Sequence, residues 1–173
     1  MRTIYVITTG GTIEKVYSEQ VGAVSNSHSK IERYLKQLRL PDCDVRVVAL
    51  MNKDSLEMTE QDRRRLAAEL TSLLPQGHPV VIVHGTDTMV ETGVYVQKLF
   101  ERQLKVPVIL TGAMTPLGFE GSDGLQNLTE SLLATRLLQP GVFVVFHGMI
   151  HQVHKVRKDR ERATFVSVVK RRG

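Results

Sequence analysis

The chain has 173 residues, of which 42% are hydrophobic and 24% charged, proportions typical of one globular domain with its own core. No apolar run approaches the ~20 residues of a membrane helix. A strand pattern begins within three residues of the start, so we expect no signal peptide and a single cytoplasmic domain over residues 1–173. The one cysteine, Cys43, excludes an intramolecular disulfide framework and fits a reducing compartment.

Positive charge is concentrated near the end of the chain. The formal net charge is +5, and residues 154–173 hold eight lysines and arginines against two acidic residues. Such a segment can attract nucleic acid, but the chain has no tryptophan and few other aromatic residues for base stacking. We therefore expect a solvated basic tail, assigned to residues 166–173, and no nucleic-acid partner.

Strand and helix patterns alternate along the chain. Runs of apolar, mostly β-branched residues predict strands near residues 3–8, 45–50, 80–83, 107–110 and 142–146. Apolar residues at helical spacing predict helices over residues 31–38, 59–74, 89–104 and 122–138, and Thr59 with Asp62 forms a capping-box variant at the start of the second. This order predicts an α/β fold: a doubly wound, mostly parallel sheet with helices on both faces, a Rossmann/flavodoxin-like three-layer sandwich.

One segment interrupts the alternation. Residues 14–29 are polar, show no clean period and follow directly after the first predicted strand. Linkers seldom lie inside a compact domain. We expect a mobile flap over the end of the first strand.

Two of the predicted strands are each followed by a glycine and then a threonine. Residues 8–13 (TTGGTI) end the first strand, and residues 84–89 (HGTDTM) follow the third. Ligands of open α/β sheets bind at the carboxyl ends of the strands, so Thr12 and Thr86 are expected to face one crevice. Either motif alone is explained by turn glycines and N-capping threonines, but the two together favour a nucleophile site.

The local chemistry of these motifs supports that interpretation. Gly10 and Gly11 permit a tight turn whose backbone amides face a ligand. The second motif opens a helix, and a helix N-terminus favours an anion or an oxyanion. Asp87 is placed there to hold a substrate ammonium or to orient a lysine. The first motif lacks the residues of a phosphate loop or a dinucleotide fingerprint, and the six histidines form no helical metal motif.

Residues 9–13 and 84–89 resemble the two signature motifs of the bacterial-type L-asparaginase/glutaminase family, and Ala113 with its neighbours, Asp123 and Asn127 resemble a third stretch. The resemblance spans about residues 4–165. It implies the family's N-terminal domain without the smaller C-terminal domain, as in a short bacterial L-asparaginase. It also implies hydrolysis of L-asparagine to L-aspartate and ammonia through an acyl-enzyme, no metal or cofactor, and a homo-oligomer, dimer or tetramer.

The resemblance implies catalytic roles for five residues. Thr12 would be the nucleophile, and Tyr17 in the flap would help to activate it. Thr86 would position water or assist proton transfer. Asp87 and Lys158 would complete the proton relay.

It also implies substrate contacts. Gly11, together with Thr86 and Asp87, would line the substrate, Ser55 would bind its α-carboxylate, and the backbone carbonyl of Ala113 would accept from its amide nitrogen. Lys155 is the alternative to Lys158 as the relay lysine.

The sequence departs from the family pattern in places. Glu14 and Lys15 follow the Thr-Ile pair where a small residue is common, and Leu56 follows Ser55 where a polar one is common. In the longer enzymes the second domain supplies an acidic group near the substrate amine. We therefore expect modest affinity for asparagine, poor use of glutamine, and a replacement contact from Glu14 or Glu57.

Two other functions stay open at this point. The chain resembles the amidase subunit of a tRNA-dependent amidotransferase, for which the basic tail would meet tRNA. Alternatively, it is a non-catalytic amino-acid-binding module that has kept the fold.

Overall fold

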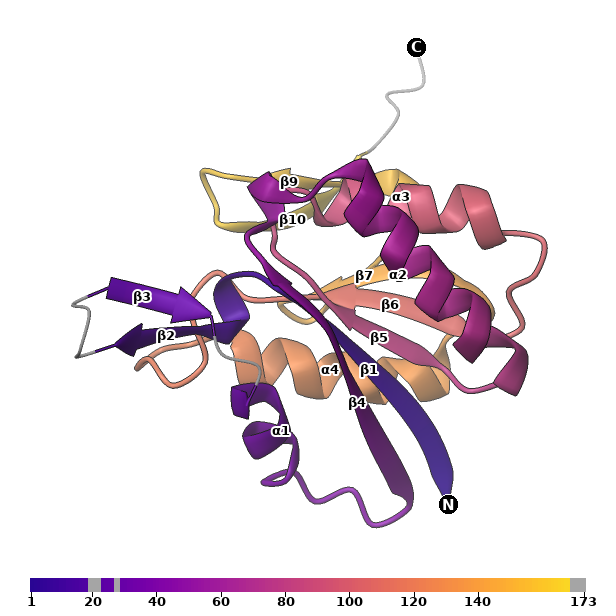
Figure 1. Cartoon of the computed structure of the whole chain (residues 1–173), viewed down its shortest axis with the longest axis horizontal. Helices are drawn as coiled ribbons and strands as arrows, with labels where there is room; N and C mark the ends of the chain where they lie inside the picture. Colours follow the sequence, from indigo (N-terminus) through magenta and orange to yellow (C-terminus); the bar gives the residue numbers. More distant parts are fainter. Residues whose placement is uncertain (19–22, 27–28, 169–173) are drawn as a thin grey trace.

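The computed structural model describes residues 1–18, 23–26 and 29–168, with only the backbone for residues 16–18, 23–26 and 29. A six-stranded sheet forms the centre of the described part (Figure 1). Its strands, in spatial order, are β4 (Cys43–Lys53), β1 (Arg2–Gly10), β5 (Val80–Val83), β6 (Pro107–Thr111), β7 (Gly141–Phe146) and β8 (Met149–Gln152). The first five are parallel and β8 is antiparallel to β7. The predicted mostly parallel sheet is confirmed.

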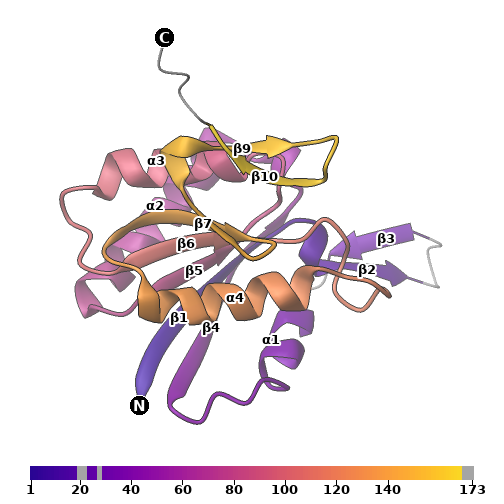
Figure 2. The ribbon, with the colours of Figure 1, turned by 180° about the vertical axis from the view of Figure 1, so that it is seen from behind.

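Helices cover both faces of this sheet (Figures 1 and 2). One face packs against α2 (Glu60–Leu73) and α3 (Met89–Phe100), and the other against α1 (Ser29–Leu35) and α4 (Gly124–Leu137). Each face has its own apolar cluster, because successive side chains of a strand point to opposite faces. Every residue of β5 is buried, as expected of a strand covered on both sides.

The predicted helix starts are closer to the structure than the predicted ends. Thr59 and Asp62 form the capping box that opens α2. The α3 helix ends at Phe100, four residues before the predicted end, and α1 ends at Leu35. A turn over residues 101–103 follows α3 in place of the last predicted helical turn.

Two hairpins were not predicted as strands. A short 3-10 turn, η1 (Thr12–Glu14), leads into the segment 14–29, where β2 (Lys15–Ser18) pairs antiparallel with β3 (Ala23–Asn26). Near the end of the chain, the 3-10 turn η4 (Val153–Lys155) precedes β9 (Val156–Asp159), which pairs antiparallel with β10 (Thr164–Ser167). The β2–β3 pair and the turn between β9 and β10 extend toward the same side of the molecule in both views (Figures 1 and 2).

The predicted basic tail, residues 166–173, has its basic residues at 170–172, so that expectation stays a prediction, whereas the basic residues before it belong to the second hairpin. Four of the eight basic residues counted there belong to β9 and its turn, and one of them, Lys158, is largely buried, with 17% of its side chain exposed. Alternating side chains of β9 therefore point inward and outward. Residues 169–173 lie outside the described residues.

Candidate active site

The two threonine motifs lie against each other. Gly11 has a φ of +89°, and a Cβ atom at this position would lie 2.5 Å from the backbone N and Cα atoms of Gly85. Only glycine permits this approach and this backbone conformation. The turn after β1 and the loop after β5 are thus in contact, one residue before Thr12 and Thr86 respectively. Thr12 is half-buried and Thr86 is buried.

Lys158 joins the second motif to the β9–β10 hairpin. Its Nζ donates to Thr86 Oγ1 at 2.7 Å and to Asp87 Oδ1 at 3.0 Å. The two alternative relay lysines are therefore distinguished by position: Lys155 lies exposed in the turn before β9. Since the ammonium already donates to Thr86 Oγ1, the hydroxyl proton of Thr86 is left for another acceptor.

Ser55 lies on the other side of the same loop. A Cβ on Gly85 would fall 2.5 Å from Ser55 Cβ and 2.6 Å from Ser55 Oγ. The Thr88 hydroxyl donates to the Ser55 carbonyl at 2.8 Å, and Asp54 forms an ion pair with Lys15 at 3.2 Å. The loop after β4 is thereby fixed to both threonine motifs. Ser55 is 3% exposed and lies next to the candidate centre.

The loop after β6 is held by a polar network. The Asp123 carboxylate accepts from the backbone amides of Met114 and Thr115 at 2.9–3.0 Å and from Asn127 Nδ2 at 3.0 Å. Asn127 also donates to the Gly112 carbonyl at 3.0 Å. These contacts fix the backbone on both sides of Ala113, which is buried. Burial raises the pKa of Asp123, but its hydrogen bonds outweigh burial and hold the pKa below its usual range.

His147 extends this network to the hairpin, a connection that sequence reasoning missed. Its Nε2 lies 2.8 Å from Asp123 Oδ2, and its Nδ1 lies 2.9 Å from Thr164 Oγ1. Thr164 pairs with Asp159 across the hairpin. His147 therefore links the loop beside Ala113 to the strand that carries Lys158. In the sequence this histidine stands in no motif that would have indicated such a link.

His84, the first residue of the second motif, lies fully buried beneath the loop. Its Nδ1 is 2.7 Å from the Gly85 carbonyl, and its Nε2 is 3.0 Å from Met58 Sδ. Burial lowers the pKa of His84 to about 4. Because a carbonyl can only accept, the neutral ring carries its proton on Nδ1 and supports the turn that precedes Thr86.

Two predicted site residues, Gly11 and Tyr17, need separate comment. The Gly11 amide donates to the Lys53 carbonyl at 2.9 Å, so this donor is used within the fold and does not face a ligand. That Gly11 lines the substrate stays a prediction. Tyr17 lies in β2, opposite Val24, but its side chain lies outside the described residues.

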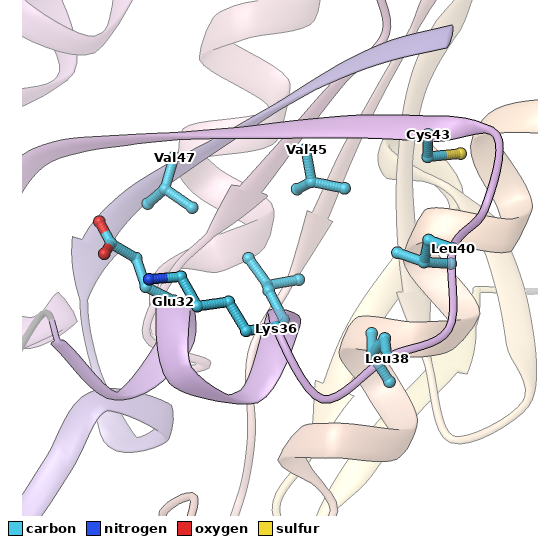
Figure 3. A pocket seen from close by; sticks show the side chains of 8 residues that line it. Glu32, Lys36, Leu38, Leu40, Cys43, Val45 and Val47 are labelled. Atoms are coloured by element: carbon cyan, nitrogen blue, oxygen red, sulfur yellow. The ribbon is translucent and has the colours of Figure 1, made fainter. Parts of the chain in front are cut away.

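The structure also has a pocket away from these loops. It measures about 390 Å³ and lies between α1 and β4 (Figure 3). Val45, Val47 and Leu40 contribute to an aliphatic lining, with Cys43 at one end. These residues lie at the amino-terminal half of β4 or before it, whereas the threonine motifs follow the carboxyl ends of their strands. This pocket is therefore separate from the candidate centre.

Two other kinds of site are absent from the described part of the chain. No group of three or more His, Cys, Asp or Glu residues in it is arranged to hold a metal ion. None of its helices has the length and apolar composition needed to cross a membrane.

Known proteins resemble this chain at the level of both sequence and fold. It is 28% identical over 155 residues to the L-asparaginase of Thermococcus kodakarensis, an alignment covering 90% of this chain and 47% of that protein. It is 34% identical over 137 residues to L-asparaginase 1 of Escherichia coli K12, covering 76% and 39%. It is also 29% identical over 179 residues to a glutamyl-tRNA(Gln) amidotransferase subunit of Methanococcus vannielii, covering 97% and 42%.

The solved structure of the thermostable L-asparaginase from Thermococcus kodakarensis superposes with a TM-score of 0.85 at 28% identity, covering 95% of this chain and 51% of that one. The chain thus spans about half, or less, of the length of these relatives. A sequence profile described as "Asparaginase, N-terminal" matches residues 3–170. The chain therefore belongs to the asparaginase family and matches the N-terminal part of its members.

Proposed function

We propose that the protein hydrolyses the side-chain amide of L-asparagine to give L-aspartate and ammonia. The observation that carries this proposal is the contact of Lys158 with both Thr86 and Asp87, on a loop that touches the turn carrying Thr12. A nucleophilic hydroxyl next to a lysine, a second hydroxyl and a carboxylate is a suitable set for acyl transfer.

In this mechanism Thr12 Oγ attacks the amide carbon. A C–O bond forms, the C–N bond breaks, and the hydroxyl proton passes through the Thr86–Lys158 pair to the departing ammonia. Water then attacks the acyl-enzyme, with its proton returning to Thr12 Oγ. Tyr17 is proposed to assist in activating Thr12 from the β2–β3 hairpin.

The same geometry supports the proposed substrate contacts. Ser55, buried against Gly85, is proposed to bind the α-carboxylate, and the Ala113 carbonyl to accept from the amide nitrogen. Asp87 is proposed to face the α-substituents of the substrate. Discrimination against glutamine is proposed because its extra methylene would move the amide carbon away from Thr12.

The test is ammonia release from L-asparagine by the purified protein, with glutamine in parallel. Thr12→Ala is expected to abolish release, and Thr12→Ser, which keeps the hydroxyl, to retain part of it. Equal release by the protein and Thr12→Ala would refute the nucleophile assignment. A kcat/KM for glutamine equal to or above that for asparagine would refute the proposed preference.

A second function is favoured by a specific finding. Relatives named as glutamyl-tRNA(Gln) amidotransferase subunits align with up to 97% of this chain at 29% identity, close to the identity of the L-asparaginases. An amidase subunit would use the same residues to release ammonia for a partner. It is distinguished by amide hydrolysis that rises several-fold when a partner subunit and charged tRNA are supplied. A non-catalytic amino-acid-binding module would instead bind asparagine equally well before and after Thr12→Ala.

The proposal includes assembly of copies of this chain in the cytoplasm. Leu133 and Leu137 of α4 and Met149 and Ile150 of β8 are 45–66% exposed, and several of these line an open pocket of about 270 Å³. Exposed apolar patches of this kind mark association surfaces. Sedimentation equilibrium of the protein and of Leu137→Glu checks this: the variant is expected to shift toward the monomer.

A further inference from the structure

Asp87 is bound by two cations, of which only one was expected. Arg160 Nη2 lies 3.0 Å from Asp87 Oδ1, the same oxygen that accepts from Lys158 Nζ at 3.0 Å. Arg160 follows Lys158 by two residues and is the first residue of the turn after β9. The hairpin therefore delivers both side chains to one carboxylate.

The charges around Asp87 do not cancel. One carboxylate faces one ammonium and one guanidinium, so this group of three carries an excess positive charge. The nearby Lys15–Asp54 pair is balanced within itself. Of the two acidic residues expected as extra contacts for a substrate amine, Glu14 is buried and Glu57 lies exposed beside Ser55. A second cation, rather than a second carboxylate, lies on Asp87.

The two cations on Asp87 affect how the α-ammonium and α-carboxylate of a substrate bind. A substrate ammonium directed at Asp87 would be the third cation on one carboxylate and would compete with Arg160 for it. A substrate with the same amide and the same carboxylate, but without the ammonium, meets no such repulsion. Its carboxylate is attracted by the excess positive charge, since a guanidinium is well suited to bind a carboxylate.

We propose that Arg160 is a specificity-determining residue of this site, and that it shifts preference toward dicarboxylic acid monoamides that lack a charged α-amine. Succinamate is the simplest member of this class, because it differs from L-asparagine only by the ammonium group. This inference rests on the proposed amide hydrolysis and names the substrate class of the same site.

The expected effect is modest in size. The Arg160 side chain is 72% exposed, and ion pairs at exposed positions are weakened by water and by salt. Arg160 is therefore displaceable, and asparagine is disfavoured rather than excluded. A change of about fivefold in relative kcat/KM is the scale expected for one partly solvated charge.

The experiment compares kcat/KM for succinamate and L-asparagine in the protein, in Arg160→Gln and in Arg162→Gln. Arg162 is a matched control because it is an exposed arginine in the same hairpin turn, so its removal changes net charge equally. Arg160→Gln is expected to lower the succinamate-to-asparagine ratio by about fivefold at low salt and by less at about 300 mM salt. Arg162→Gln is expected to leave it unchanged. An unchanged ratio in Arg160→Gln, or an equal shift in both variants, would overturn the inference.

Failure of the proposed function is recognised separately. If neither amide is hydrolysed by the protein, the hydrolytic function fails, and binding then decides the inference on its own. Calorimetry with succinate and L-aspartate replaces turnover. Succinate binding more tightly relative to aspartate in the protein than in Arg160→Gln supports the role of Arg160. The same relative affinities in both proteins contradict it.

Discussion

Lowering the pH is expected to destabilise the fold through His84. The ring is fully buried, donates from Nδ1 to the Gly85 carbonyl, and has a pKa lowered by burial to about 4 from an ordinary 6.5. In the unfolded chain the same ring becomes protonated as the pH falls through about 6.5. The unfolded state then binds a proton that the folded state does not bind. The free energy of unfolding is therefore highest above pH 6.5 and decreases as the pH falls toward 4.

The size of this loss follows from the two pKa values. Because the unfolded ring takes up a proton between about pH 8 and pH 5.5 and the folded ring does not, the free energy of unfolding falls by about 1.4 kcal/mol over this interval. The carboxyl groups with lowered pKa values, such as Asp62 and Asp123, contribute below this interval. Burial also lowers the pKa of His151, which adds a loss of the same sign.

The assay is reversible urea denaturation of the protein and of His84→Asn at both pH values. Asparagine can keep a donor near the position of Nδ1 but does not titrate. The loss of stability between the two pH values is expected to be about 1.4 kcal/mol smaller in the variant. Contributions from His151 cancel in this difference. An equal loss in both proteins would show that His84 is not the titrating group.

Two more predictions concern the site. Lys158→Met is expected to lower kcat by about 10²- to 10⁴-fold, the usual range for a group that transfers protons. Its circular dichroism spectrum is expected to be unchanged. Ammonia-release kinetics measure the effect, and a loss of less than tenfold would contradict the proposed role of Lys158. Gly85→Ala is expected to cost about 1–3 kcal/mol of unfolding free energy, because the new methyl group would lie 2.5 Å from Ser55 Cβ. Urea denaturation measures this cost, and an unchanged midpoint would count against the close packing described.

The sequence predicted the sheet and its helices because those signals are local. The fully apolar run Val80–Val83 is typical of a strand covered on both sides, and Thr59 with Asp62 marks the start of α2. The hairpins escaped prediction for a physical reason. Their strands are four residues long and paired only with each other, and β9 and β10 each place one residue, Val156 and Phe165, in the core, so the apolar alternation is too short to predict a strand.

The candidate site divides in the same way. The threonines, Asp87 and the glycines beside them were recognisable from the sequence because each stands in a short motif at a strand end, and the resemblance to a family singled out Lys158. No local pattern indicated that Arg160 would lie on Asp87, or His147 between Asp123 and Thr164.

What the sequence by itself determined is the alternation of elements and the positions where glycine permits a close turn, since both depend on neighbouring residues. The tertiary structure decided which side chains meet across 71 or 72 residues, as Lys158 meets Asp87 and Thr86. Such contacts depend on the register of a hairpin and on its packing against the sheet. Both follow from the sum of many weak contacts across the fold, none of which is visible in a short stretch of sequence.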